Sequence, residues 1–264
     1  MSLTNKTIAN SYKDLLQVDN SNNGVDGNTR KIKDGEGTIS ALSLSDDIVA
    51  IQPVNDDTAA TFIVTNLAGT TFFAVNTSNN QVQALGNNLN TQYAIFGVGN
   101  TQTANFVDDT HHPIPYSNSI YGTSLSGHVP VFGTSTDPAT TFTTAEGNGT
   151  RASDLVPCLW YVNDDISIDA IISIEGADTA TGDTTRMHLF SYDFTSGSTS
   201  CLTAGALVAH NNDVTNAGSE QPYLTTWTVD SAAVTAGKVI LAFFKSDSIN
   251  SDYSVNITVK YHLT

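Results

Sequence analysis

Two stretches in the C-terminal half decide the fold: Ile166-Ser-Ile-Asp-Ala-Ile-Ile-Ser-Ile174 and Tyr253-Ser-Val-Asn-Ile-Thr-Val-Lys-Tyr-His-Leu263. In both, apolar residues recur at every second position: Ile166, Ile168, Ala170, Ile172 and Ile174, then Tyr253, Val255, Ile257, Val259, Tyr261 and Leu263. Because successive side chains of a strand point to opposite faces, this period predicts two strands that are each buried on one face.

Further strands are predicted between these two, over Thr185–Tyr192, Tyr223–Val229 and Lys238–Phe244, separated by turns rich in Asp, Gly and Ser. Short strands at this spacing are typical of an antiparallel sandwich. The sequence therefore predicts a C-terminal antiparallel jelly-roll-type β-sandwich over residues 93–264, with a loop-rich entry from Tyr93 to Pro130 that contains one or two strands.

The composition agrees with an all-β class. Charged residues make up 14% of the 264 residues, below the roughly 25% of an average soluble domain. Thr, Ser, Asn and Gly are abundant instead, and these residues favour strands and turns over helix interiors. With 39% hydrophobic residues the chain has enough apolar side chains for one large core or two smaller ones.

A more slender β segment is expected over residues 53–92. The sequence predicts three short strands here, joined by two tight turns that contain Asn: Thr61–Val64, Thr71–Val75 and Gln81–Gly86. Strands this short cannot cover their own apolar side, which favours packing against other copies of the chain. The residues predicted to form the core of this shaft are Phe62, Val64, Phe73, Val75, Val82 and Leu85.

The N-terminal region, residues 1–52, begins with a predicted amphipathic helix over Thr4–Val18. Its apolar stripe consists of Ile8, Tyr12, Leu15 and Leu16, at helical spacing. A helix of about four turns is marginal alone, so the stripe is expected to dock on a partner. The polar linker Asp19–Asn28 follows, and then extended stretches near Ile39–Leu44 and Ile48–Ile51.

The net charge of −16 and a pI near 4.3 argue against nucleic acid as a partner, because the chain repels phosphate backbones. No apolar run approaches the roughly 18 residues of a membrane span, so no membrane insertion is expected. The N-terminus lacks the features of a secretory signal. One reading is a protein made in a host cytoplasm and exposed on a particle surface.

Sequence motifs for catalysis are not found: there is no G-x-S-x-G, P-loop, dinucleotide fingerprint or H-E-x-x-H pattern. We therefore expect no enzyme activity and no cofactor. His111 and His112, next to Asp108 and Asp109, are candidate ligands of a metal ion on a symmetry axis. The alternative is that they are loop histidines with local hydrogen bonds.

Trp160 and Trp227 are candidate ligand-contact aromatics, but both occur in apolar strand patterns, which favours core packing. The two cysteines, Cys158 and Cys201, are expected to be free thiols, with a single bridge as the alternative.

Several motifs resemble tail-fibre-like structural proteins of marine tailed bacteriophages. The N-terminal part of the resemblance lies in Lys6–Val18, Asp34-Gly-Glu-Gly-Thr38 and Ser40-Ala-Leu-Ser-Leu44. Phe62-Ile-Val-Thr-Asn66 and Gly69-Thr-Thr-Phe-Phe-Ala-Val-Asn76 are similar to fibre shaft units. Asn- and Gly-rich turns between short strands also recur in unrelated fibrous proteins.

The resemblance implies a homotrimeric fibre, on the tail or the head, which attaches to other virion proteins by its N-terminus. Its C-terminal tip would bind a host surface glycan or protein. Because the chain is short for a long tail fibre, the alternative is a capsid decoration or cement protein that stabilises the head shell. A polysaccharide-degrading spike with an acidic pair shared between subunits is a third reading.

Overall fold

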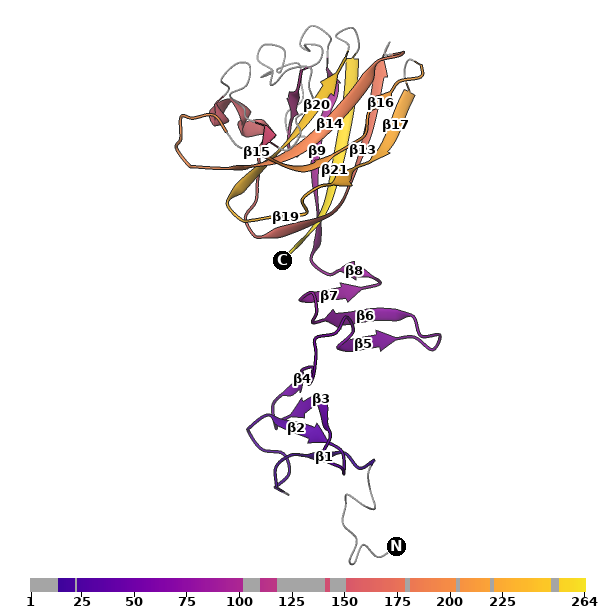
Figure 1. Ribbon diagram of the computed structural model, residues 1–264, viewed down its shortest axis with the longest axis vertical. Helices are drawn as coiled ribbons and strands as arrows, with labels where there is room; N and C mark the ends of the chain where they lie inside the picture. Colours follow the sequence, from indigo (N-terminus) through magenta and orange to yellow (C-terminus); the bar gives the residue numbers. More distant parts are fainter. Residues whose placement is uncertain are drawn as a thin grey trace, which may run out of the picture. The chain divides into compact units, whose positions relative to one another are not determined.

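The residues that the structure describes are mostly in β-strands, and these strands form antiparallel sheets (Figure 1). The computed structural model describes residues 14–21, 23–101, 110–117, 141–142, 151–178, 181–202, 205–218, 221–247 and 252–264. The chain divides into an N-terminal unit, Met1–Leu89, and a C-terminal unit, Asn90–Thr264. The two are described separately below.

The first sheet of the N-terminal unit has the order β1 (Gln17–Val18), β2 (Arg30–Lys33), β3 (Ile39–Leu44) and β4 (Val49–Ile51). All of its pairs are antiparallel. The strand predicted over Ile39–Leu44 is confirmed, and β4 begins one residue after the predicted start.

The prediction of a helix is wrong for its last residues, Gln17 and Val18. Gln17 and Val18 are extended and pair with Lys33 and Ile32. Ile32 is buried, so the sheet gains an apolar contact there that an isolated short helix would not have. Leu15 and Leu16 precede β1 and are 49% and 65% exposed. Ile8 and Tyr12 lie outside the described residues.

The second sheet of this unit runs in chain order, β5 (Phe62–Thr65), β6 (Thr71–Asn76), β7 (Gln81–Ala84) and β8 (Asn87–Asn88). The three strands predicted here are confirmed within one or two residues at each end. The additional strand β8 follows from a tight turn at Leu85 and Gly86, both of which have positive φ.

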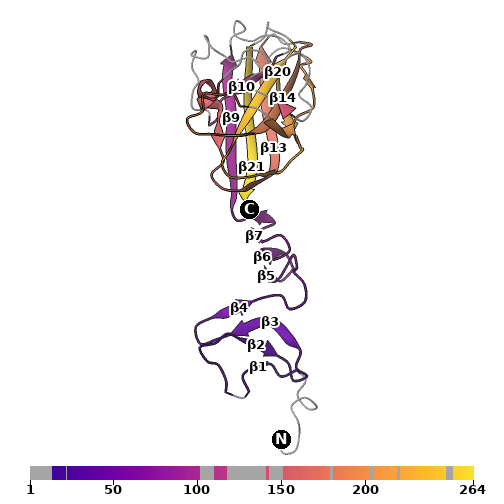
Figure 2. The same cartoon turned by 60° about the vertical axis from the view of Figure 1, so that its left-hand side comes forward.

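The C-terminal unit consists of two larger sheets (Figures 1 and 2). The sheet that we call the first has the order β17 (Gln221–Thr226), β13 (Ile166–Asp178), β21 (Asp252–Leu263) and β9 (Thr91–Thr101), with β19 (Ala233–Val234) beside β13. The second has the order β10 (His112–Ile114), β20 (Lys238–Ser246), β14 (Thr184–Asp193), β15 (Gly205–His210) and β11 (Thr141–Phe142). Three short strands pair with strands of this sheet: β12 (Trp160–Tyr161) with β20, β16 (Val214–Thr215) with β14, and β18 (Thr228–Val229) with β15.

The main core lies between these two sheets. Phe96, Ile171 and Val259 from the first sheet belong to the same buried cluster as Met187, Leu189 and Phe244 from the second. The inward residues of β21 are those that the alternation predicted, with Val255, Ile257 and Val259 at most 4% exposed.

The second sheet is also covered on its outer face. Phe190, Tyr192 and Phe243 point away from the main core and form a second cluster with Leu155 of the 3₁₀ helix η3 (Ala152–Cys158) and with Leu202. This explains why β14 and β20 are almost continuously buried. Such two-sided burial gives continuous apolar runs instead of alternation.

The predicted single face of β13 is wrong beyond Ile168. A bulge at Asp169 shifts the register between Ile168 and Ala170, so the inward positions become Ile171, Ser173 and Glu175. Ile172 and Ile174 consequently point out of the core and are 43% and 51% exposed. One extra residue reverses the face of every residue that follows it in the strand.

Candidate functional site

One face of the β5–β8 sheet is entirely apolar across three strands. Phe62 of β5 pairs with Val75 of β6, which pairs with Val82 of β7. The next row on the same face is Val64, Phe73 and Ala84. We call these six residues the apolar face. Five of the six residues predicted for the shaft core therefore lie together, with the rings of Phe62 and Phe73 6.1 Å apart.

Local turn chemistry sets this register. Asn66 begins the first turn: its backbone carbonyl accepts a hydrogen bond from the N–H of Gly69 at 3.0 Å, and its side-chain oxygen accepts one from Thr70 at 2.8 Å. Gly69 has φ 84°, a left-handed conformation that glycine adopts without strain. The second turn is held by Asn76, whose side chain accepts from the N–H of Asn79. Asn at these positions favours tight hairpins.

The described residues of its own unit leave the apolar face partly exposed. Phe62, Val64 and Val82 are 40%, 46% and 39% exposed, and neither buried core cluster of the described residues includes a residue of this sheet. A small sheet with one unburied apolar face is at best marginally stable in water. The face thus has the character of a contact surface.

Leu85 does not belong to this face. Ala84 pairs with Asn87, which places Leu85 in the connecting turn with φ 49° and 66% exposure. The sequence-based assignment of Leu85 to the shaft core is therefore corrected: the strand ends one residue before it.

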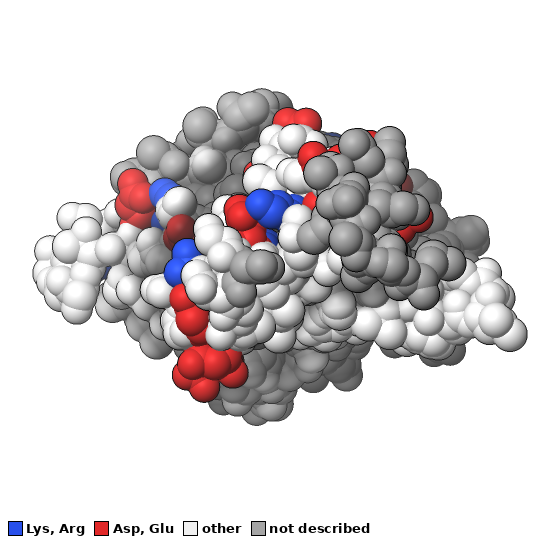
Figure 3. Space-filling view, turned by 90° about the horizontal axis from the view of Figure 1, so that it is seen from below, with Lys and Arg blue, Asp and Glu red and all other residues white. Residues whose placement is uncertain are grey.

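The first sheet of the N-terminal unit also exposes aliphatic side chains. Ile39 of β3 and Val49 and Ile51 of β4 are between 42% and 68% exposed. This sheet carries ion pairs as well, between Arg30 and Asp26 and between Lys33 and Asp19. In Figure 3, which views the molecule from below, basic and acidic side chains lie next to each other in small groups between wider uncharged areas.

The candidate histidines are buried in the C-terminal unit instead of lying in a loop. His112 begins β10, opposite Phe244 of β20, and both His111 and His112 are at most 2% exposed. The ring of His111 lies 5.2 Å from that of His188. Burial, followed by the nearby charges, lowers the pKa of His111 to about 3 and that of His188 to about 2. Neutral imidazoles therefore suit this site.

No group of three or more His, Cys, Asp or Glu side chains that could hold a metal ion is found in the described part of the chain. His112 Nε2 lies 3.2 Å from the Thr110 hydroxyl. Asp108 and Asp109, the predicted neighbours, lie outside the described residues.

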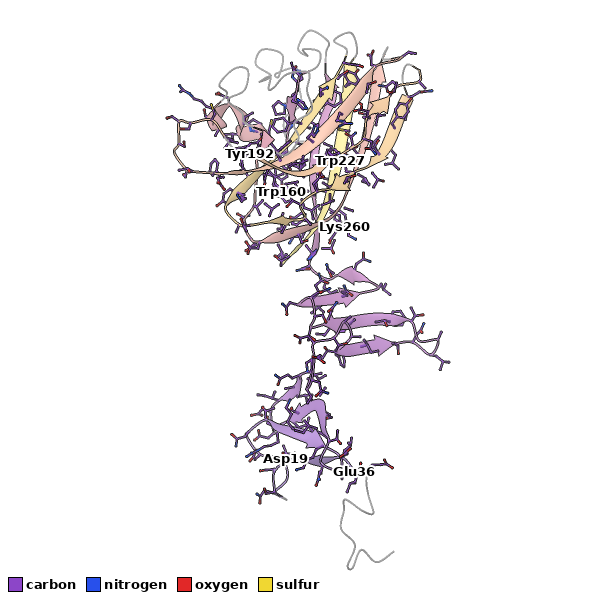
Figure 4. All side chains as sticks on the ribbon, in the orientation of Figure 1. Asp19, Glu36, Trp160, Tyr192, Trp227 and Lys260 are labelled. Atoms are coloured by element: carbon purple, nitrogen blue, oxygen red, sulfur yellow. The ribbon has the colours of Figure 1, made fainter. Side chains whose placement is uncertain are left out.

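Both tryptophans lie inside the C-terminal unit (Figure 4). Each is 5% exposed and belongs to the main core cluster. Trp227 donates a hydrogen bond from Nε1 to the Ser173 hydroxyl at 2.9 Å, while Trp160 stacks on Tyr116. Neither ring is available to an external ligand, so core packing is the reading that their burial supports.

Glu175 is a buried carboxyl group that the sequence analysis did not single out. It is 2% exposed, and the Thr185 hydroxyl lies 2.7 and 2.6 Å from its two oxygens. Burial raises the pKa of Glu175 to about 7, against a smaller lowering by Thr185. One feature of the sequence could have pointed to Glu175: it is an acidic residue that directly follows the alternating apolar run of β13.

Cys158 and Cys201 are both free, the first buried and the second partly exposed. No helix among the described residues has the length and hydropathy needed to cross a membrane. Comparison of the sequence with models of known protein families finds no match, and comparison with curated proteins finds none either.

Proposed function

We propose that this chain is the subunit of a homotrimeric, fibre-like structural protein of a tailed-phage virion. In this proposal residues 1–52 attach to other virion proteins, the β5–β8 sheet forms a short intertwined shaft, and the C-terminal unit is a tip that contacts the host surface. The observation that carries the proposal is the uncovered apolar face of the β5–β8 sheet.

Self-association would bury the apolar face and so stabilise the β5–β8 sheet. Burying a half-exposed Phe or Val side chain contributes about 1 kcal/mol, roughly half the value for full burial. Phe62, Val64 and Val82 would therefore supply a few kcal/mol per chain, together with smaller gains at Phe73 and Val75. The resemblance to phage fibre proteins supports three copies, because such fibres are trimeric and intertwined.

The strand order of the C-terminal unit supports a jelly-roll-type β-sandwich. Its eight principal strands pair from the outside inward: β9 with β21, β10 with β20, β13 with β17, and β14 with β15. This is the pairing of one long antiparallel hairpin folded over into two sheets, which is the jelly-roll arrangement. Jelly rolls occur widely as binding and capsid domains, which suits a tip and assigns it no catalytic step.

The exposed aliphatic residues of β3 and β4 favour a second candidate, a decoration protein that stabilises the capsid. Ile39, Val49 and Ile51 would then be covered by neighbouring capsid proteins. The two candidates differ in location. Immunogold labelling over the head would favour the decoration protein or a head fibre, and labelling of the tail would exclude the decoration protein.

The oligomeric state tests the primary proposal. Light scattering after size-exclusion chromatography should give three times the 27.9 kDa of one chain. Val64→Asp, which places a charge on the apolar face, should shift the mass toward that of the single chain. Ile63→Asp is the matched control, because Ile63 neighbours Val64 on the same strand, points to the opposite face and is 47% exposed.

A wild-type mass of one chain would overturn the proposal. Equal dissociation by both variants would show that the two faces of β5 are equally involved, which contradicts the assignment of the apolar face. Circular dichroism of both variants checks that the C-terminal unit stays folded, since neither residue contributes to its core.

A further inference from the structure

Among the described residues of the C-terminal unit, large apolar side chains on the outer face of the β17–β13–β21–β9 sheet are exposed. The second sheet is covered on both sides, by the main core and by η3 with Leu202. On the outer face of the first sheet, by contrast, Tyr93, Ile174 and Leu224 are 63%, 51% and 71% exposed. Figure 2 shows β9, β21 and β13 of this sheet side by side.

The apolar residues of this outer face form a continuous patch. Ile95 of β9 and Ile172 of β13 flank Thr258 of β21 in one row. In the next row Leu224 of β17 lies beside Ile174, which pairs with Asn256. An exposed sheet face normally carries polar residues at such positions, so two Ile residues on β13 and a Leu on β17 mark a contact surface.

A shallow groove adjoins this patch. It has a volume of about 510 Å³, and its lining includes Gly99, Ile174, Gly176, Pro222 and Asn256. The glycines leave room there: a Cβ atom added to Gly99 would meet no atom within 4 Å. A projecting side chain such as Leu224 of another molecule could enter such a groove.

Charge points to another copy of this chain as the occupant. Each copy carries a net charge of −16, so identical chains repel wherever their acidic surfaces meet. The two rows through Thr258 and Asn256 contain no acidic side chain, because Glu175 points into the core. Lys260, next to Tyr93, is the nearest charged residue along β21. Asp169, farther along β13, faces His262 at 2.8 Å.

The size of the face also suits a stable contact. The four strands β17, β13, β21 and β9 are 6, 13, 12 and 11 residues long, so at about 3.3 Å per residue and about 4.8 Å between strands they cover about 670 Å². Standard protein interfaces bury about 800 Å² per partner.

We propose that the outer face of the β17–β13–β21–β9 sheet packs against the same face of the other copies in the trimer. This inference rests on the proposed function. Strand β9 begins at Thr91, two residues after the N-terminal unit ends at Leu89, so association of the shafts would raise the effective concentration of the C-terminal units near one another.

Thiol labelling of the full-length protein tests the contact. In a Cys201→Ser background, Asn256→Cys places a reactive thiol in the middle of the outer face, and Ser153→Cys places one on η3 as the control. Both positions are exposed in the single chain. Cys158 should not react with maleimide, because burial raises the pKa of its thiol to about 12.

In the trimer, maleimide should label Asn256→Cys at least about tenfold more slowly than Ser153→Cys, because labelling then requires local opening. Adding Ile174→Asp should restore fast labelling of Asn256→Cys while the mass remains that of three chains, since the shaft still holds the copies together. Gly99→Phe, which fills the groove, should act in the same direction.

The outcomes separate this inference from the proposed function. A trimer in which both thiols react equally fast would overturn the inference alone and leave the face open to a different partner. A monomer by light scattering would overturn the proposed function and the inference with it.

Discussion

Glu175 places an ionisable group inside the core of the C-terminal unit, where it contacts Thr185 of the opposite sheet. A carboxylate there loses its hydration, and one hydroxyl donor replaces only part of it. The protonated form is therefore the one that the core favours, and the pKa of Glu175 rises from 4.5 to about 7. The free energy of unfolding therefore depends on the pH through the ionisation of Glu175.

Glu175→Gln should remove that dependence. Between pH 4.5 and about 7 the native state binds more protons than the unfolded state, so the stability of the wild type falls as the pH rises through this window. The loss above pH 7 is on the order of 3 kcal/mol. In urea unfolding the variant should be more stable than the wild type by about 1–3 kcal/mol at pH 8 and nearly equal to it at pH 4.5.

Asp164→Asn, an exposed position, serves as the control and should show no such difference. If Glu175→Gln differed from the wild type by the same amount at both pH values, ionisation of Glu175 would not be the cause.

Leu85 adopts a conformation that its side chain disfavours. Its φ of 49° in the turn between Ala84 and Asn87 costs on the order of 1 kcal/mol for a leucine, whereas asparagine tolerates it. Leu85→Asn should therefore raise the melting temperature of the N-terminal unit. Because Leu85 lies off the apolar face, the mass by light scattering should not change. Dissociation of the variant would show instead that the Leu85 side chain is an intermolecular contact.

At the level of strands, the sequence predicted β21, which is buried on one face, and also β14 and β20, which are buried on both faces. The alternation of β21 is uninterrupted, and so both its position and its inward residues could be predicted. The position and length of β9 were not predicted within the loop-rich entry, because Gly97 and Gly99 give this segment the composition of a loop. Strand β2 was missed because Arg30, Lys31 and Lys33 obscure the single buried residue, Ile32.

The bulge at Asp169 explains why the residues on the outer face of the β17–β13–β21–β9 sheet could not be predicted from the sequence. The residues from Ile166 to Ile174 fit an unbroken alternation if Ile171 is counted among the outward residues. Only the pairing of Ala170 with Lys260 and of Ile171 with Val259 shows that the phase changes. Register depends on the partner strand and on long-range packing, which a single strand does not contain.

The 3₁₀ helix η3 is the element that covers the second sheet, and Leu155 is its central contact. Leu155→Ala should destabilise the protein by about 2–5 kcal/mol, because it opens a cavity against Phe190 and Phe243. Val156→Ala is the matched control: Val156 is the next residue and is 64% exposed, whereas Leu155 is fully buried. Chemical denaturation of both variants measures the difference. Equal, small effects would show that η3 does not stabilise the outer face of this sheet.

For the whole molecule, the apolar face of the β5–β8 sheet could be predicted because it needs only three short strands and their turns, which are local in sequence. The two-sheet arrangement of the C-terminal unit was predicted as a class from strand spacing. The buried position of His111 and His112 was not, since it depends on β10 pairing with β20, more than 100 residues later in the chain.

The net charge of −16 per chain opposes every association of copies, and it would set the salt dependence of the proposed trimer. Apolar contacts at Phe62, at Val64 and on the outer face of the β17–β13–β21–β9 sheet are not screened by salt. If these contacts drive association, salt screens only the repulsion between the acidic chains. The Debye length falls from about 30 Å at 0.01 M salt to about 8 Å at 0.15 M.

Raising NaCl over that range should therefore strengthen the trimer and lower the protein concentration at half-association by roughly tenfold. Sedimentation equilibrium at several concentrations measures this shift, and Val64→Asp, which adds a charge to the contact, should show a steeper dependence on salt. Weaker association at higher salt would mean that ion pairs between copies hold the trimer together, because screening acts on attraction and repulsion alike. In that case the uncharged faces would not be the principal contacts.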